Sequence, residues 1–297
     1  MSDVSHAGLT VSDLDRSIWF YTELLGLEVR RRYVADPEVS QRMWQGTPGL
    51  THLDAVMLRI PKSEQELQLL QPTGDFGECL QAAGHPLDIG AAHFGLAVDD
   101  LEAVVARLGE HGFKPLSGGI VRGSGATDGF RAACVPDPDG FVVELIQRSG
   151  RPDAVEVFIA VTVADLEQSL WYYRDVLGME VLRRADGNTE LAREMWHEPD
   201  IESVKLVVLK KPGLVQYLKL REVTGLNQSH VVRRQCDVGF SHMCLAVDDL
   251  ANTVAELEPK GITPTSLVWG AGLTAQFVGN SHVPDPDGFD LELLQEP

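Results

Sequence analysis

Residues 6–32 read HAGLTVSDLDRSIWFYTELLGLEVRRR, and nearly the same stretch returns at residues 158–184 as FIAVTVADLEQSLWYYRDVLGMEVLRR. Thirteen of the 27 aligned positions are identical. A match of this length inside one chain indicates an internal duplication, which is examined before any single element is assigned.

Two further pairs extend the duplication to both halves of the chain. The stretch HFGLAVDDLEAVVARLGEHGF at 93–113 is similar to HMCLAVDDLANTVAELEPKGI at 242–262, and VPDPDGF occurs unchanged at 135–141 and 283–289. We therefore divide the chain into two domains, residues 1–150 and residues 151–297.

A weaker repeat divides each half again. All four segments begin with a short apolar strand, followed by an aspartate that is suited to cap a helix; these are Asp13, Asp99, Asp165 and Asp248. A glycine ends each predicted helix, namely Gly26, Gly112, Gly178 and Gly261, and short β-like runs follow. The class is α+β, with four strand–helix–strand–strand–strand modules at 1–72, 90–148, 153–224 and 237–297.

Composition narrows the class of protein. The 297 residues carry 25 Lys and Arg against 44 Asp and Glu, a formal charge of −19, which disfavours nucleic acid and anionic membranes as partners. No apolar run reaches the roughly 18 residues of a membrane span, and residues 1–6 show no signal peptide. Cys79, Cys134, Cys236 and Cys244 are scattered, so we expect reduced thiols in a cytoplasmic protein.

Histidines and glutamates recur at fixed strand positions. His6, His93 and His242 each share a strand face with small residues, and Glu144 and Glu292 lie in the middle of apolar strands. A carboxylate there is costly unless it is paired or binds a metal. Two histidines and a carboxylate in one cavity suit Fe(II), Mn(II), Zn(II) or Co(II).

The first and third modules depart from this pattern. Phe158 takes the histidine position in the third module, and the glutamate positions are Gln68 in the first module and Lys219 in the third. Only the second and fourth modules therefore carry both the histidine and the glutamate.

The pattern resembles the vicinal oxygen chelate superfamily, which includes glyoxalase I, extradiol dioxygenases, methylmalonyl-CoA epimerase and bleomycin-resistance proteins. The resemblance rests on H-x-x-L-x-V-x-D-L, S-x-W-F-Y…L-G and V-P-D-P-D-G-F…E-L. It implies four βαβββ modules that form two cup-shaped, open, mixed β-barrels. It also implies one divalent metal per chain, with Fe(II) favoured, and a small-molecule substrate that chelates the metal through adjacent oxygens. A homodimer is compatible with the sequence.

The resemblance leaves the pairing of the modules open. If neighbouring modules pair, the ligands are His6, Gln68, His93 and Glu144; if the outer modules pair, they are His6, Gln68, His242 and Glu292. We favour neighbours, because the first half contains a full ligand set and sequential elements usually pack together.

Three functions follow from this resemblance, in order of preference. The first is an Fe(II) ring-cleaving dioxygenase of the extradiol or hydroquinone type, in which His282 would be a catalytic acid or base if the outer modules pair. The second is a non-redox lyase or isomerase of the glyoxalase or epimerase type. The third is a metal-free protein that binds a small molecule such as an antibiotic.

Overall fold

A computed structural model describes residues 6–35, 37–44, 47–76, 84–148, 157–212, 217–231, 233–239, 241–269 and 278–295. Cys79 and the predicted domain boundary between residues 150 and 151 lie outside these residues. Within them, no helix is both long and apolar enough to span a bilayer.

Each of the four modules folds as a strand, a helix and further strands. The first contains β1 (His6–Thr10), α1 (Leu14–Trp19), β2 (Glu28–Ala35), α2 (Pro37–Met43), β3 (Leu50–Arg59) and β4 (Glu66–Gly74). The second contains β5 (Ala92–Val98), α3 (Leu101–Glu110), β6 (Val121–Arg122), β7 (Arg131–Pro136) and β8 (Val142–Gln147).

The third and fourth modules repeat this order. The third contains β9 (Val157–Thr162), α4 (Leu166–Leu170), β10 (Glu180–Asp186), α5 (Thr189–Trp196), β11 (Ser203–Lys210) and β12 (Tyr217–Thr224). The fourth contains β13 (Ser241–Ala246), α6 (Leu250–Leu257), β14 (Ser266–Trp269), β15 (Gly279–Pro284) and β16 (Asp290–Gln295). Helices α1 and α4 continue as π-helical turns at Phe20–Leu24 and Trp171–Val176, and α2 and α5 are additions to the predicted module.

The helix caps agree with the sequence at two of the four predicted aspartates. Asp13 and Asp165 accept hydrogen bonds from backbone N–H groups in the first turns of α1 and α4. In the two D-D-L stretches the cap is the second aspartate, Asp100 or Asp249, so the prediction of Asp99 and Asp248 was one residue early. The second aspartate directly precedes the first helical leucine, which is the position from which a side chain reaches the first-turn N–H groups.

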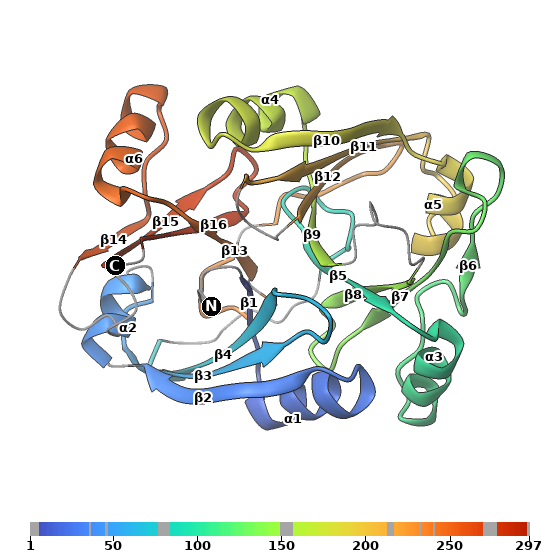
Figure 1. The fold of residues 1–297 in the computed structure, drawn as a ribbon, viewed down its shortest axis with the longest axis horizontal. Coiled ribbons are helices and arrows are strands. Elements are labelled where there is room, and N and C mark those ends of the chain that lie inside the picture. The colour runs from blue at the N-terminus through green and yellow to red at the C-terminus, as the bar shows by residue number, and fades with distance from the viewer. Residues whose placement is uncertain are drawn as a thin grey trace.

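Two eight-stranded sheets join the modules in an order that the repeats did not predict. One sheet runs β14-β15-β16-β13-β1-β4-β3-β2 and the other β10-β11-β12-β9-β5-β8-β7-β6. The first and fourth modules therefore form one curved sheet, named here the outer cup, and the second and third form the inner cup (Figure 1). Each half of the chain contributes one module to each cup.

The preference for pairing the first module with the second was therefore wrong. Nine residues separate β8 from β9, whereas 17 separate β4 from β5. The short connection favours pairing of the second and third modules, which are also sequence neighbours. The first and fourth modules then pair with each other through antiparallel β1 and β13.

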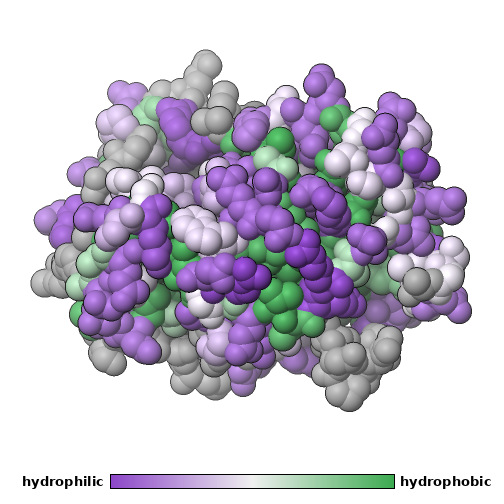
Figure 2. Space-filling model, turned by 90° about the horizontal axis from the view of Figure 1, so that it is seen from above, coloured by the Kyte–Doolittle hydropathy of each residue, from purple (hydrophilic) through white to green (hydrophobic). Residues whose placement is uncertain are grey.

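The two faces of the sheets differ as the strand alternation predicted. Leu9, Leu96 and Leu245 are buried in one core cluster together with helix residues such as Leu14 and Leu250. Helices α1, α3, α4 and α6 lie outside the cups, while α2 contacts β3 and β14 and α5 contacts β7 and β11 across the open sides (Figure 1). Polar residues cover much of the face shown in Figure 2, with hydrophobic areas between them.

The repeated D-P-D-G turns join the two cups to each other. Tyr21 of the outer cup donates a hydrogen bond from its hydroxyl to Asp137 of the inner cup, at 3.0 Å. Tyr173 of the inner cup donates the equivalent bond to Asp285 of the outer cup, at 2.8 Å. Both carboxylates also accept backbone N–H groups of their own turns, so each turn is a fixed acceptor for the neighbouring cup.

This contact yields a stability prediction with an internal control. We expect Tyr21→Phe and Tyr173→Phe each to lower the free energy of unfolding by about 1–2 kcal/mol, because a buried carboxylate loses a donor. Tyr172 is equally buried, but its hydroxyl has no hydrogen-bond partner among the described residues. Tyr172→Phe should therefore change the free energy of unfolding little. Urea unfolding, followed by tryptophan fluorescence, measures this free energy for all three variants. An equal loss of stability in all three variants would contradict a stabilising role for the two tyrosine–aspartate hydrogen bonds.

Candidate metal centre

Three of the predicted ligands meet inside the outer cup. His6 on β1, His242 on β13 and Glu292 on β16 place one ligand atom each within 4.8 Å of one another. Oε2 of Glu292 lies 3.1 Å from Nε2 of His6 and 3.5 Å from Nε2 of His242. The three side chains are 4%, 2% and 6% exposed, so the cluster is shielded from solvent.

The strand register explains why these side chains converge. Antiparallel β1 and β13 place Gly8 opposite His242, and parallel β13 and β16 place Cys244 opposite Glu292. A Cβ at Gly8 would collide with the imidazole ring of His242. A glycine at position 8, on the same strand as His6, is thus required for His242 of the fourth module to enter the cup.

The two oxygens of Glu292 have different neighbours. Asn280 on β15 donates its Nδ2 to Oε1, whereas Oε2 faces the Nε2 atoms of His6 and His242. Burial alone would raise the pKa of Glu292, but the two histidines hold that pKa well below its usual range.

A divalent cation fits this donor set. Burial lowers the pKa of His242, which favours the uncharged imidazole that binds a metal. A buried negative charge is costly until a cation balances it. The nitrogen and oxygen donors match the preferences of Fe(II), Zn(II), Mn(II) or Co(II).

Gln68 lies on the same face of the sheet as the cluster. Parallel β1 and β4 place it opposite Gly8, the residue that also faces His242. Its Nε2 donates to the hydroxyl of Tyr33 at 2.9 Å. That bond orients the amide, and the amide oxygen is the atom suited to a metal.

His282 lies beside the cluster and is fully buried. It is opposite Glu292 in the antiparallel β15–β16 pair, and its ring centre lies 5.8 Å from that of His242. Its Nδ1 is hydrogen-bonded to Asp290, while its Nε2 has no hydrogen-bond partner in the described ranges. Burial would lower the pKa of His282, but Asp290 raises it above the ordinary value.

Sequence reasoning missed two supporting residues, Asn280 and Asp290. A signal for both was present, because each is a polar residue two positions from a predicted site residue on the same strand. Without the β15–β16 pairing, neither could be distinguished from a polar residue on a solvent-facing edge.

Among the described residues, the inner cup brings together His93 and Glu144 without a second histidine. Nε2 of His93 lies 2.8 Å from Oε2 of Glu144, and Nζ of Lys219 lies 3.3 and 3.4 Å from the two Glu144 oxygens. The Phe158 ring lies 4.0 Å below the Lys219 ammonium. The ligand set expected from neighbouring modules, with His6 and His93 around one metal, is therefore wrong, because these histidines belong to different sheets.

The two cups differ systematically at equivalent positions. Five polar residues of the outer cup have different counterparts in the inner cup. The pairs, outer residue first, are His6 and Phe158, Gln68 and Lys219, His282 and Cys134, Asn280 and Ala132, and Asp290 and Val142. Only the His–Glu pair is common to both, as His242 with Glu292 and His93 with Glu144. The outer cup alone therefore combines a ligand set with a surrounding polar layer.

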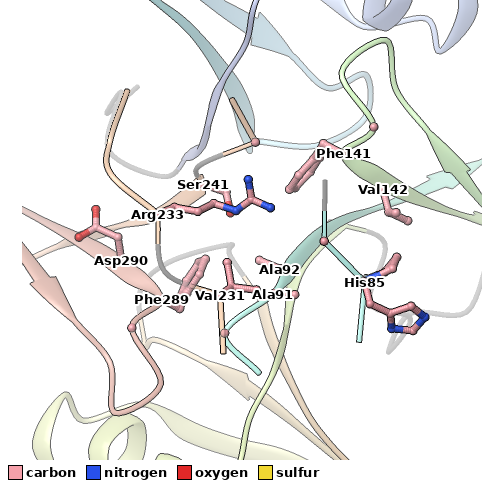
Figure 3. A pocket seen from close by; sticks show the side chains of 16 residues that line it. His85, Ala91, Ala92, Phe141, Val142, Val231, Arg233, Ser241, Phe289 and Asp290 are labelled. Carbon is pink, nitrogen blue, oxygen red and sulfur yellow. The ribbon is translucent and has the colours of Figure 1, made fainter. Parts of the chain in front are cut away.

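A cavity between the cups is lined by Asp290 but by none of the three clustered residues His6, His242 and Glu292. It lies where the two D-P-D-G-F turns meet, with Phe141 and Phe289 on opposite sides and Arg233 between them (Figure 3). Its volume is about 60 Å³, far below the several hundred Å³ of a typical small-molecule site. We therefore assign the candidate site to the outer cup.

Curated proteins with similar sequences include several lactoylglutathione lyases. A putative lactoylglutathione lyase of Brassica oleracea is 28% identical over 220 residues, covering 72% of this chain and 68% of the relative. The lactoylglutathione lyase of Schizosaccharomyces pombe is 24% identical over 320 residues, covering 99% and 96%. A probable chloroplastic lactoylglutathione lyase of Arabidopsis thaliana is 28% identical over 184 residues, and this chain spans only 45% of its length.

Solved structures share the fold. Glyoxalase I from Zea mays has a TM-score of 0.64 at 21% identity, over 98% of this chain and 92% of that one. A putative dioxygenase from Bacillus subtilis has a TM-score of 0.60 at 13% identity, over 99% and 85%. Both likenesses support the α+β cup architecture.

The family model gives the assignment. The model for the Glyoxalase/Bleomycin resistance protein/Dioxygenase superfamily matches residues 3–145 and again residues 157–293, which covers most of the chain. The two matches agree with the duplication and with the resemblance drawn from the sequence. The chain belongs to the Glyoxalase/Bleomycin resistance protein/Dioxygenase superfamily.

Proposed function

We propose that the protein is an enzyme that binds one divalent metal in the outer cup through His6, His242 and Glu292, with Gln68 as a fourth ligand. We propose further that it is a lyase or isomerase of the glyoxalase type. One observation carries the proposal: Glu292 is a buried carboxylate that has two imidazoles and an amide beside it but no lysine or arginine among its described neighbours.

The substrate class follows from the ligand chemistry. A metal held on one side by protein ligands has open positions for a small molecule that offers two adjacent oxygens. When bound, the metal supplies Lewis acidity at a carbonyl, which makes a neighbouring C–H easier to deprotonate. The names of the curated relatives support a lyase more than the dioxygenase that the sequence analysis placed first.

His282 and Asp290 supply proton transfer in this proposal. The Asp290 carboxylate fixes Nδ1 of His282, which leaves Nε2 on the cup side of β15 as the exchanging atom. Such a pair can accept a proton from one carbon of the substrate and return it to the next. The inner cup has Cys134 and Val142 at these positions, so this step belongs to the outer cup.

An Fe(II) ring-cleaving dioxygenase is the second candidate. Two histidines and one carboxylate form the ligand set of non-haem iron oxygenases, and the outer cup provides that set. The third candidate, a metal-free binding protein, is disfavoured because it would leave Glu292 buried without a cation.

Metal binding provides the first test. We expect about one equivalent of Co(II) per chain for the wild type, and a loss of affinity of at least about 100-fold for His6→Ala and His242→Ala, because each removes a ligand. His93→Ala is the matched control in the inner cup and should keep about one equivalent. Similar, mild losses in all three variants, measured by Co(II) absorption titration, would rule out a single site in the outer cup.

Kinetics test the roles of His282 and Asp290. With the adduct of methylglyoxal and glutathione as substrate, we expect His282→Gln and Asp290→Asn to lower kcat by about 10²–10⁴-fold, the usual range for general acid–base catalysis. KM and metal content should change little, because neither residue is a ligand. The His52–Asp54 pair on the helix face of β3 provides the control, and His52→Gln should leave kcat unchanged. Unaltered turnover in His282→Gln would remove this residue from the chemistry.

Metal identity separates the two enzyme candidates. Protein purified without oxygen and without a metal-affinity tag should be fully active with a redox-inert ion such as Zn(II), and should consume no oxygen. Stoichiometric iron together with oxygen uptake on catechols or hydroquinones would replace the lyase by the dioxygenase.

A further inference from the structure

The inner cup contains a cation of its own. Lys219 on β12 extends toward Glu144 on β8, and its Nζ lies nearly equidistant from both carboxylate oxygens, at 3.3 and 3.4 Å. The side chain of Lys219 is 17% exposed and that of Glu144 is 3% exposed, so the pair is largely shielded from solvent. The ammonium therefore interacts with the carboxylate that corresponds to Glu292 of the outer cup.

We propose that the Lys219 ammonium takes the place of the metal ion in the inner cup. The inner cup is a latent second site for a divalent cation, and the positive charge of Lys219 prevents a cation from binding there. The inference rests on the proposed metal in the outer cup, since that site is the reference for the comparison.

The balance of charge differs between the two cups. The inner cup surrounds Glu144 with Lys219 and with the buried Arg221, whereas the described neighbours of Glu292 in the outer cup include no lysine or arginine. Burial lowers the pKa of His93 to about 4, so its imidazole adds no charge at neutral pH. One carboxylate with two cations leaves the inner cup positive, and repulsion between like charges in a buried site disfavours a further cation.

Packing keeps the ammonium in place. Phe158 lies over Gly95 and presents its ring to Lys219 at 4.0 Å, a cation–π contact. Trp196, at the end of α5, lies 5.1 Å from the His93 ring and 4.5 Å from the Arg221 guanidinium. The two aromatic rings thus stabilise both cations beside Glu144.

The outer cup allows a direct test of the ammonium as a metal substitute. Gln68 occupies the position equivalent to Lys219, so Gln68→Lys would introduce the inner-cup cation beside Glu292. We expect this variant to lower the Co(II) affinity by at least about 100-fold through charge repulsion. Gln68→Met is the matched control without charge and should cost about tenfold or less, because His6, His242 and Glu292 remain.

A gain-of-site variant tests the same idea in the other direction. The triple variant Phe158→His, Lys219→Gln and Arg221→Leu gives the inner cup the residues found in the outer cup at His6, Gln68 and Leu70. We expect Co(II) binding to rise from one to two equivalents per chain. Circular dichroism and the unfolding temperature establish that the variant is folded before its metal content is counted.

The outcomes separate this inference from the proposed function. Equal Co(II) affinity in Gln68→Lys and Gln68→Met would show that an ammonium there does not exclude the metal, and would overturn the inference even if the triple variant does not fold. A folded triple variant with one equivalent would also overturn it. Failure of the wild type to bind any Co(II) would instead overturn the proposed function.

Discussion

The burial of one carboxylate between two histidines is the constraint on which the rest of the account depends. Glu292 is 6% exposed and is fixed by Asn280 at one oxygen, while its other oxygen faces His6 and His242. An isolated buried charge is costly to maintain. The sheet register, Gly8 and the pairing of the first and fourth modules together place this carboxylate beside two imidazoles. The proposed divalent cation would balance its charge.

Duplication explains why the chain has two cups with different contents. Each half contributes one module to each cup, so equivalent positions of the two cups come from different halves of the chain. The His–Glu pair persists in both cups, while the first and third modules diverged to His6 with Gln68 and to Phe158 with Lys219. One cup is suited to hold a metal and the other is filled by aromatic rings and side-chain cations, and the Tyr21–Asp137 and Tyr173–Asp285 contacts join them.

Local features were predictable from the sequence because they depend on nearby residues. Strand alternation placed His6 and Leu9 on opposite faces, and the four helix-ending glycines have the left-handed conformation that was expected. The pairing of modules depends on connections and on strand pairing between residues far apart in the chain, so the repeats alone could not decide between His93 and His242. Asn280 and Asp290 gain meaning only when β15 and β16 lie side by side.

Crystals grown with Co(II) would test the central claim directly through anomalous diffraction at the cobalt absorption edge. The account predicts one strong anomalous peak per chain, inside the outer cup and within bonding distance of His6, His242 and Glu292. A peak between His93 and Glu144, or none in the outer cup at saturating Co(II), would contradict it.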